Sequence, residues 1–173
     1  MAIRVAPNPV NLTWANFRIV DSSPDLSGNE VAQIHPETRM PANIQVVNNH
    51  NLFRLAPFTL GVVPVQQDTI VLRSAQQTAD LLRHEQGHYD LLILTVRAMA
   101  RELDALTSGS AGDLNSRVQA IQQTHAARAQ TLDSTYDTQT RNGADVDQQT
   151  NWNQAIAAAL GNPRASAVNG MAL

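Results

Sequence analysis

The sequence predicts an α+β fold: a small antiparallel N-terminal sheet packs on a long helix, which is followed by an antiparallel helical hairpin and a third helix. Two observations predict it. Residues 11–73 carry short β-branched runs separated by Asn, Pro and Asp, whereas residues 74–163 carry apolar side chains at three- and four-residue steps. Because 173 residues suit one compact domain, we expect a single domain over residues 1–163 and a flexible tail over residues 164–173.

The strand-rich part, residues 11–73, is expected to form four or so short antiparallel strands. Asn48 to Asn51 form a polar run that favours a turn between two of them. The β-branched or alternating runs lie at residues 12–20, 31–34, 44–47, 52–60 and 70–72.

The helical part, residues 74–163, contains three periodic segments. Ser74 and Gln77 have the spacing of a capping box, so the first helix is expected to begin at Ser74 and to run to about residue 106. A break near Gly109 and Gly112 separates it from a second helix over about 113–139. A third helix is expected over about 145–160, and the first two should pack as an antiparallel hairpin.

Composition and charge exclude several classes of function. The net charge is −3 and the basic residues are scattered, so nucleic acid is not an expected partner. The chain has no cysteine, which excludes a disulfide framework, a thiolate zinc site and a cysteine nucleophile. It shows neither a signal-peptide core nor a membrane span, so we expect a soluble protein. Secreted, periplasmic and cytoplasmic locations all stay open, as does the oligomeric state.

The first predicted helix contains the motif HExxH, at residues 84–88. Positions i and i+4 of a helix lie on one face, so His84 and His88 can bind one zinc ion together, while Glu85 can reach a zinc-activated water as general base and acid. The alternative is an ordinary boundary pair of histidines beside a solvated glutamate. Gly87 argues against it: glycine is unfavourable inside a helix, so a strand or a substrate is expected to pack closely there.

A catalytic zinc ion needs a third protein ligand, and the helical hairpin limits the choice. If the turn centres near Ser110, residues equally distant from it on the two helices lie opposite each other. His88 then faces the neighbourhood of residue 132, and His84 that of residue 136. Asp133 and Asp137 both fall in this window.

The chain contains further polar residues that could contribute to such a site. Tyr136 could polarise a substrate carbonyl or stabilise its oxyanion. His125 is a competing ligand, but its register on the packed face favours a hydrogen-bonded core histidine. Glu102 lies too far along the same helix to reach the site. His35 and His50 are expected to be structural or exposed.

These residues resemble a known family, the predicted bacterial zinc-dependent proteases called domain of unknown function 922. The resemblance spans nearly the whole chain, and the HEQGH helix is its most specific part. It rests on residues 81–90, on Tyr136, Asp137, Thr140, Asn142 and Gly143, on Gln149 and Trp152, and on Trp14 and Phe17.

The resemblance implies a zincin-like fold and metallopeptidase activity. Asp137 matches the family pattern as well as the hairpin geometry, and is therefore the preferred third ligand beside His84 and His88. The family often has a histidine where this chain has Asn142, and if that histidine is a ligand or a catalytic donor, activity is weakened or lost here.

The leading hypothesis is therefore a zinc-dependent metallopeptidase that hydrolyses a peptide or protein substrate. Glu85 would act as general base and acid, and Tyr136 would assist it. The alternative is a catalytically weak or inactive metal-binding or protein-interaction domain on a zincin scaffold, to which Asn142 lends support. Hydrolysis of an amide or ester in a non-protein substrate, such as a cell-wall peptide, is a third possibility.

Overall fold

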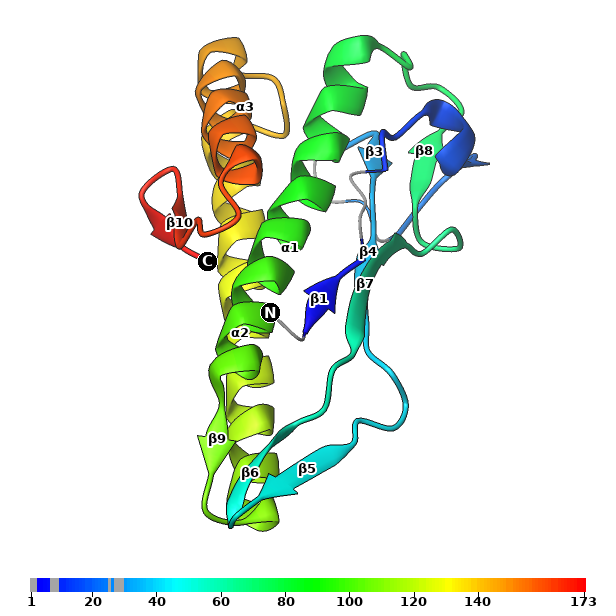
Figure 1. Ribbon diagram of the computed structural model, residues 1–173. Helices are drawn as coiled ribbons and strands as arrows, with labels where there is room; N and C mark the ends of the chain where they lie inside the picture. Colours follow the sequence, from blue (N-terminus) through cyan, green and yellow to red (C-terminus); the bar gives the residue numbers. More distant parts are fainter. Residues whose placement is uncertain (1–2, 7–9, 25, 27–29) are drawn as a thin grey trace.

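Three α-helices dominate the part of the chain described by the computed structural model, which covers residues 3–6, 10–24, 26 and 30–173. They are α1 (Ala79–Ala105), α2 (Ala111–Thr140) and α3 (Val146–Gly161). Helices α1 and α2 lie antiparallel and side by side over their length, and α3 packs against both near the end that joins α2 to α3 (Figure 1). The α+β class and the helical hairpin are thus confirmed.

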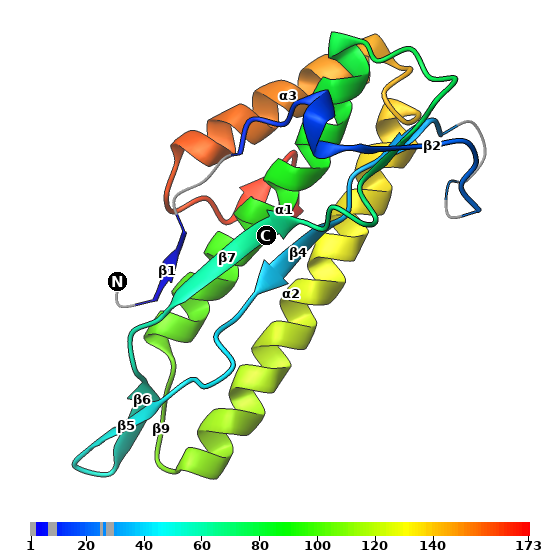
Figure 2. The same ribbon diagram turned by 90° about the vertical axis from the view of Figure 1, so that its right-hand side faces the viewer.

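Short strands cover the face of α1 that α2 and α3 leave free. Strands β7 and β4 run along this face, and a turn of 3₁₀ helix, Trp14–Asn16, precedes β2 (Figure 2). The strands are β1 (Arg4–Val5), β2 (Arg18–Val20), β3 (Ala32–Gln33), β4 (Pro36–Arg39), β5 (Val46–Asn49), β6 (Leu52–Leu55), β7 (Thr59–Pro64), β8 (Ile70–Leu72), β9 (Thr107–Ser108), β10 (Ala167–Val168) and β11 (Met171–Ala172).

The strands form small separate sheets with the orders β1-β7-β4, β2-β8-β3, β5-β6-β9 and β10-β11 among the described residues. The expectation of one antiparallel sheet is wrong, because β1 pairs with β7, and β2 with β8, in parallel. Parallel neighbours need a long connection between them, and the strands in between supply it. The predicted turn at residues 48–51 is confirmed: it joins β5 to β6, with His50 and Asn51 both at positive φ.

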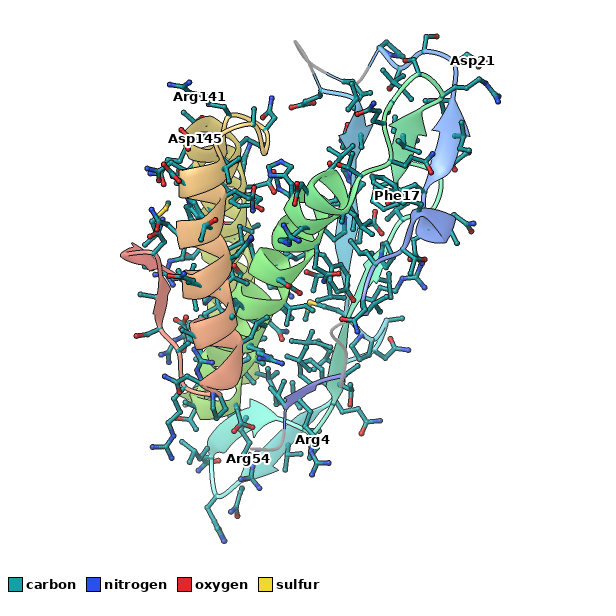
Figure 3. The ribbon with its side chains drawn as sticks, turned by 90° about the horizontal axis from the view of Figure 1, so that it is seen from above. Arg4, Phe17, Asp21, Arg54, Arg141 and Asp145 are labelled. Atoms are coloured by element: carbon teal, nitrogen blue, oxygen red, sulfur yellow. The ribbon has the colours of Figure 1, made fainter. Side chains whose placement is uncertain are left out.

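Helix α1 is the centre of the molecule because opposite faces of it are buried in different cores. Ile93, Val96 and Leu103 pack with the strands in one core, whereas Leu91 and Leu94 pack with α2, α3 and the β10–β11 hairpin in the other. Seen from above, the helices lie on one side and the strands on the other, with side chains filling the space between (Figure 3). A helix buried on both sides can hold functional groups rigidly.

Helix α1 begins later than the sequence suggested. Its N-cap is Thr78, whose hydroxyl accepts a hydrogen bond from the Leu81 N–H at 3.1 Å. The predicted capping box at Ser74 is therefore wrong: residues 73–75 form a turn after β8 instead. A threonine with its acceptor directed at the first turn satisfies one of the helix's unpaired N–H groups, which is why Thr78 caps it.

The last ten residues, expected as a flexible tail, pack against the helices. Strands β10 and β11 form a hairpin in which Val168 and Leu173 are buried. Arg128 of α2 donates to the Leu173 carbonyl at 2.8 Å, and Arg101 of α1 donates to the Pro163 carbonyl at 3.1 Å. These contacts come from helices distant in the sequence, so the composition of the tail gave no sign of them. Within the described residues, no helix has the length and apolar character of a membrane span.

Candidate metal centre

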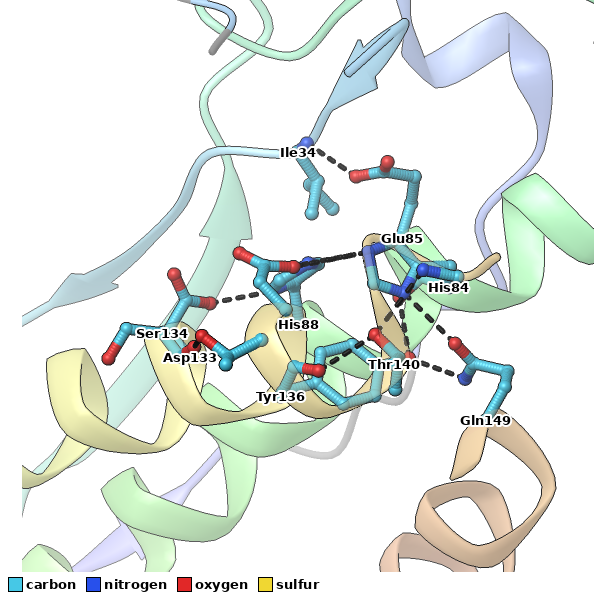
Figure 4. A network of polar contacts seen from close by, with 12 residues as sticks. Ile34, His84, Glu85, His88, Asp133, Ser134, Tyr136, Thr140 and Gln149 are labelled. Carbon is cyan, nitrogen blue, oxygen red and sulfur yellow. Dashed lines mark hydrogen bonds and ion pairs between the residues drawn. The ribbon is translucent and has the colours of Figure 1, made fainter. Parts of the chain in front are cut away.

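Three side chains from α1 and α2 converge on one point. The Nε2 atoms of His84 and His88 lie 3.2 Å apart, and Asp137 Oδ1 lies 3.2 Å from the first and 3.0 Å from the second. Figure 4 shows the group seen from close by. The two histidines share a face of α1 because they are four residues apart, and the antiparallel hairpin brings Asp137 opposite them.

The second ring nitrogen of each histidine has an acceptor of its own. His84 Nδ1 lies 3.0 Å from Gln149 Oε1, and His88 Nδ1 lies 2.6 Å from Asp133 Oδ1. A carboxylate or an amide oxygen can only accept, so both Nδ1 atoms carry the proton in neutral imidazoles. Both Nε2 atoms then present lone pairs toward Asp137. Such partners are typical of metal-binding histidines, whose orientation and tautomer they fix.

The orientation of the Gln149 amide is fixed by its own neighbours. Its Nε2 donates to Asn153 Oδ1 at 2.8 Å and to the Tyr136 hydroxyl at 2.6 Å. Tyr136 in turn donates to the His84 carbonyl at 3.1 Å. Every donor in this chain of hydrogen bonds meets an acceptor, which leaves the amide oxygen of Gln149 for His84.

Tyr136 lies beneath the histidines and explains the glycine of the motif. Its ring stacks on His84 with centroids 4.8 Å apart. A Cβ atom added to Gly87 would lie only 2.2 Å from the Tyr136 hydroxyl oxygen. The predicted close contact at Gly87 therefore exists, but the neighbour is Tyr136 of α2 and neither a strand nor a substrate. The Tyr136 side chain is fully buried and does not line the cavity described below.

The loop between α2 and α3 closes the site from the other side. Arg141, Asn142 and Gly143 all adopt positive φ, and a Cβ atom on Gly143 would lie 3.1 Å from His84 Cβ. Glycine suits this position both for its backbone conformation and for the space available. The loop places Asn142 on the wall of the cavity.

The Glu85 side chain extends toward Ile34, on the strand side of the site (Figure 4). Its Oε2 accepts a hydrogen bond from the Ile34 N–H at 2.8 Å, and the residue is only 2% exposed. Burial raises the pKa of Glu85, although His88, His84 and the Ile34 N–H oppose this effect. A carboxylate with a raised pKa beside a cavity can accept and return a proton.

The charges of His88 and Asp137 depend on each other and on their neighbours. Burial alone would lower the pKa of His88, but the carboxylates of Asp133 and Asp137 outweigh it and raise this pKa well above its ordinary value. Burial raises the pKa of Asp137, yet the hydrogen bonds with His84 and His88 prevail and hold it below its ordinary value. The three atoms thus require positive charge among them, which a proton or a metal cation can supply.

The spacing of the three atoms fits a zinc ion. Ligands about 2.0–2.1 Å from a tetrahedral zinc lie about 3.3 Å from one another, close to the distances of 3.0–3.2 Å found here. Two imidazoles and one carboxylate leave a fourth position, as in catalytic zinc sites. Among the described residues, His84, His88 and Asp137 are the set whose geometry suits a metal ion.

The group opens on a cavity of about 500 Å³ between the strands and the hairpin. Residues 30–36 form one wall, which includes His35, and α1 and α2 form the others. Glu85 and Asn142 line this cavity together with the three converging residues. The size falls within the range of about 300–1,000 Å³ for small-molecule sites.

The other polar residues that the sequence offered as ligands do not converge on this point. His125 is 3% exposed and its Nε2 lies 2.9 Å from Glu102 Oε2, away from the three converging atoms. Asp133 contacts His88 Nδ1 and is not one of the three residues whose ligand atoms converge. His50 lies in the β5–β6 turn and is exposed.

Two contributors were not predicted from the sequence as parts of the site. Gln149 entered only through the family resemblance, and the Ile34 backbone N–H did not enter at all. The need of each histidine for an Nδ1 partner is a signal that could have pointed to a polar residue on α3. A backbone N–H leaves no mark in the sequence.

Comparisons with known proteins give a match to one family model and no significant match to a curated protein or a solved structure. Residues 66–144, slightly less than half of the chain, match the family model described as "Bacterial protein of unknown function (DUF922)". The matched segment contains α1, α2 and all three converging residues, but neither Ile34 nor Gln149.

Proposed function

We propose that this protein is a zinc-dependent metallopeptidase. One observation carries the proposal: the two Nε2 atoms and Asp137 Oδ1 converge within 3.2 Å of one another while both Nδ1 atoms are already hydrogen-bonded. Three lone pairs directed at one point repel each other unless a cation lies between them.

His84, His88 and Asp137 would hold the zinc ion. When bound, the ion supplies a Lewis acid that polarises a substrate carbonyl and lowers the pKa of water toward about 7. Gln149 and Asp133 keep the two imidazoles in the tautomer that leaves Nε2 free. The ligand geometry is therefore set before the ion arrives.

Glu85 would move the proton during hydrolysis. Its carboxylate lies on the cavity wall, is shielded from solvent and has a raised pKa. It takes a proton from the attacking water and returns it to the leaving amine, so the C–N bond breaks and a new C–O bond forms. The hydrogen bond from the Ile34 N–H keeps one carboxylate oxygen in place.

Tyr136 receives a positioning role in this proposal. Its hydroxyl donates to the His84 carbonyl and accepts from Gln149, so it holds the helix and the amide in register. A direct role in polarising the carbonyl, as expected from the sequence, would require the hydroxyl to reach the cavity. Asn142 lies on the cavity wall and is better placed to contact a substrate.

Metal content is the first experiment. Elemental analysis of protein purified without chelator should find close to one zinc per chain, and His84→Ala and Asp137→Ala should both abolish it. The matched controls His50→Asn and Asp147→Asn change exposed residues and should keep the metal. If the wild-type protein binds no zinc after zinc is added back, the proposal fails.

Catalysis needs a separate measurement on zinc-loaded protein. Cleavage of a mixed peptide library should be detected by mass spectrometry, and Glu85→Gln should abolish turnover while keeping the metal. Zinc binding without cleavage of any peptide would favour the alternative, a metal-binding interaction domain. Full activity of Glu85→Gln would contradict the role given to this residue.

A further inference from the structure

A second cavity of about 230 Å³ lies beside the first, between β4, α1 and α2. Leu92 and Ala129 line both cavities, so they adjoin. A molecule that occupies the larger cavity can therefore extend a group into the smaller one. The smaller cavity is below the roughly 300 Å³ at which whole small-molecule ligands are usually held, so one side chain is the appropriate size.

The walls of the second cavity are mainly apolar. Met40, Val96, Met99 and Ala126 contribute to them, together with the shared Leu92 and Ala129. Apolar walls favour the body of an apolar or aromatic side chain over a charged one. They do not by themselves distinguish between leucine, phenylalanine and tyrosine.

His125 supplies the distinguishing feature. It lines the cavity and is only 3% exposed. Its Nε2 lies 2.9 Å from Glu102 Oε2. A carboxylate can only accept, so Nε2 carries the proton and Nδ1 of the neutral ring is an acceptor. Nδ1 is buried and has no hydrogen-bond partner in the described part of the chain.

Two other polar side chains of this wall each donate a hydrogen bond within the protein. The Thr95 hydroxyl donates to the Leu91 carbonyl at 3.0 Å, and Gln122 Nε2 lies 2.9 Å from Met40 Sδ. A buried acceptor without a donor is unfavourable, and a ligand that brings a donor relieves it. The cavity therefore suits a group with an apolar body and one hydrogen-bond donor at its tip.

We infer that this cavity is a specificity subsite for a tyrosine side chain of the peptide substrate, whose phenol O–H donates to His125 Nδ1. Tyrosine combines a rigid apolar ring with a single hydroxyl and loses little conformational entropy on binding. Phenylalanine would fill the same space but leave Nδ1 unpaired. A site built around a substrate hydroxyl discriminates against the analogue that lacks it. This inference rests on the proposed peptidase function for its substrate, although the cavity can be tested without catalysis.

The first test uses small probes and the metal-free protein. p-Cresol and toluene are titrated separately while the ¹³C-methyl NMR signals of methionine are followed. Met40 and Met99 line the cavity and should shift, whereas Met171 lies in β11 and serves as control. We expect p-cresol to bind at least tenfold more tightly than toluene. Equal binding of the two probes, or no shift with either up to its solubility limit, would overturn the inference.

A His125→Leu variant tests the hydrogen bond directly. It keeps an apolar side chain at this position and removes the acceptor, so the preference for p-cresol should disappear while toluene still binds. A preference retained in this variant would show that another group recognises the phenol, against the inference. If the variant fails to fold, the comparison of p-cresol with toluene on the wild-type protein still decides.

The second test uses zinc-loaded protein and a matched set of peptides with Tyr, Phe, Leu or Ala scanned along the positions around the cleavage site. At one position, kcat/KM for Tyr should exceed that for Phe about tenfold, and His125→Leu should equalise them without loss of zinc. The two failures are distinguishable. Cleavage without a preference for Tyr removes the subsite alone, whereas phenol binding without zinc or cleavage removes the peptidase alone.

Discussion

The imidazole of His84 is oriented by a residue 65 positions away in the sequence, Gln149 of α3. The amide oxygen of Gln149 receives the Nδ1 proton, and its amide nitrogen is held by Tyr136 and Asn153. At the scale of single residues, the proposed metal centre thus depends on a polar group outside the helices that carry the three converging residues.

Replacing Gln149 should weaken zinc binding although no ligand is changed. Gln149→Leu removes the acceptor of His84 Nδ1, and loss of such a partner typically costs 10–100-fold in metal affinity. Competition with a chromophoric zinc chelator measures it. Gln148→Leu, an exposed neighbour, should have no effect, and Gln149→Glu, which keeps an acceptor, should restore part of the affinity. Equal losses in the Leu and Glu variants would mean that packing, and not the acceptor, matters.

Gly87 makes a second prediction at this scale. In Gly87→Ala the new methyl group must displace the Tyr136 ring, whose hydroxyl oxygen lies 2.2 Å from the added Cβ. Overpacking of this kind destabilises by about 1–3 kcal/mol, measured as the free energy of unfolding in urea. Gly112→Ala is the control: its Cβ would meet nothing within 4 Å, so improved helix propensity should stabilise by up to about 1 kcal/mol. Two variants of equal stability would contradict the close packing of Tyr136.

At the scale of elements, one polar face of α1 secures the segment before the 3₁₀ helix. Gln86 Oε1 accepts from the Leu12 N–H at 2.8 Å, and Gln86 Nε2 donates to the Val10 carbonyl at 3.1 Å and to Asp90 Oδ1 at 3.0 Å. One side chain thus satisfies backbone groups of a segment that lies outside the strands. Asp90 supports it from the next turn of the helix.

Asp90 should make the stability of the protein depend on pH. Burial raises its pKa from 3.8 to about 6, against the opposing effect of Gln86. A carboxyl with a raised folded-state pKa contributes stability that is fully present below pH 4 and is lost as the pH rises through about 6. The loss amounts to at most about 3 kcal/mol. Relative to wild type, Asp90→Asn should therefore gain stability between pH 4 and pH 7 in urea unfolding of the metal-free protein.

An exposed carboxylate provides the control for this pH profile. Asp68 lies on the surface in the turn before β8, and Asp68→Asn should follow the wild-type profile. A difference between Asp90→Asn and wild type that is constant across pH would show that Asp90 does not titrate in this range.

At the scale of the whole molecule, the β10–β11 hairpin completes the second hydrophobic core. Leu173 and Val168 are buried with residues of all three helices, among them Leu94, Leu132 and Trp152. Arg101 also contacts the Ala165 carbonyl, next to this hairpin. The hairpin therefore helps to hold α3, and with it Gln149, against α1 and α2.

Truncating Leu173 should destabilise the protein as a core mutation does. Leu173→Ala leaves a cavity and should cost about 2–5 kcal/mol, measured as the free energy of unfolding. Ala172→Ser, an exposed neighbour, should change it by less than about 0.5 kcal/mol. Zinc affinity should also fall in Leu173→Ala if α3 loosens. A stability equal to that of the control would mean that the hairpin does not pack in solution.

The strands show why sequence patterns did not predict how the strands pair. Strand β4 has the polar sequence Pro-Glu-Thr-Arg and no β-branched run, and its structure comes from pairing with β7 over residues 36–39. The parallel pairs β1–β7 and β2–β8 likewise join segments about fifty residues apart in register. Pairing of this kind depends on which edge the tertiary fold leaves free, which no local pattern records.

The sequence by itself determined the three helices, apart from where α1 begins, and the three residues of the proposed metal centre. The spacing of His84 and His88 follows from 3.6 residues per turn, and the position of Asp137 follows from equal rise along two antiparallel helices. Both are local or nearly local geometry. Only the tertiary structure decided which groups surround them: Gln149 and Asp133 at the imidazoles, the Ile34 N–H at Glu85, and His125 in an adjoining cavity. These contacts join separate elements, because each polar atom taken from water must find its partner wherever the packing places one.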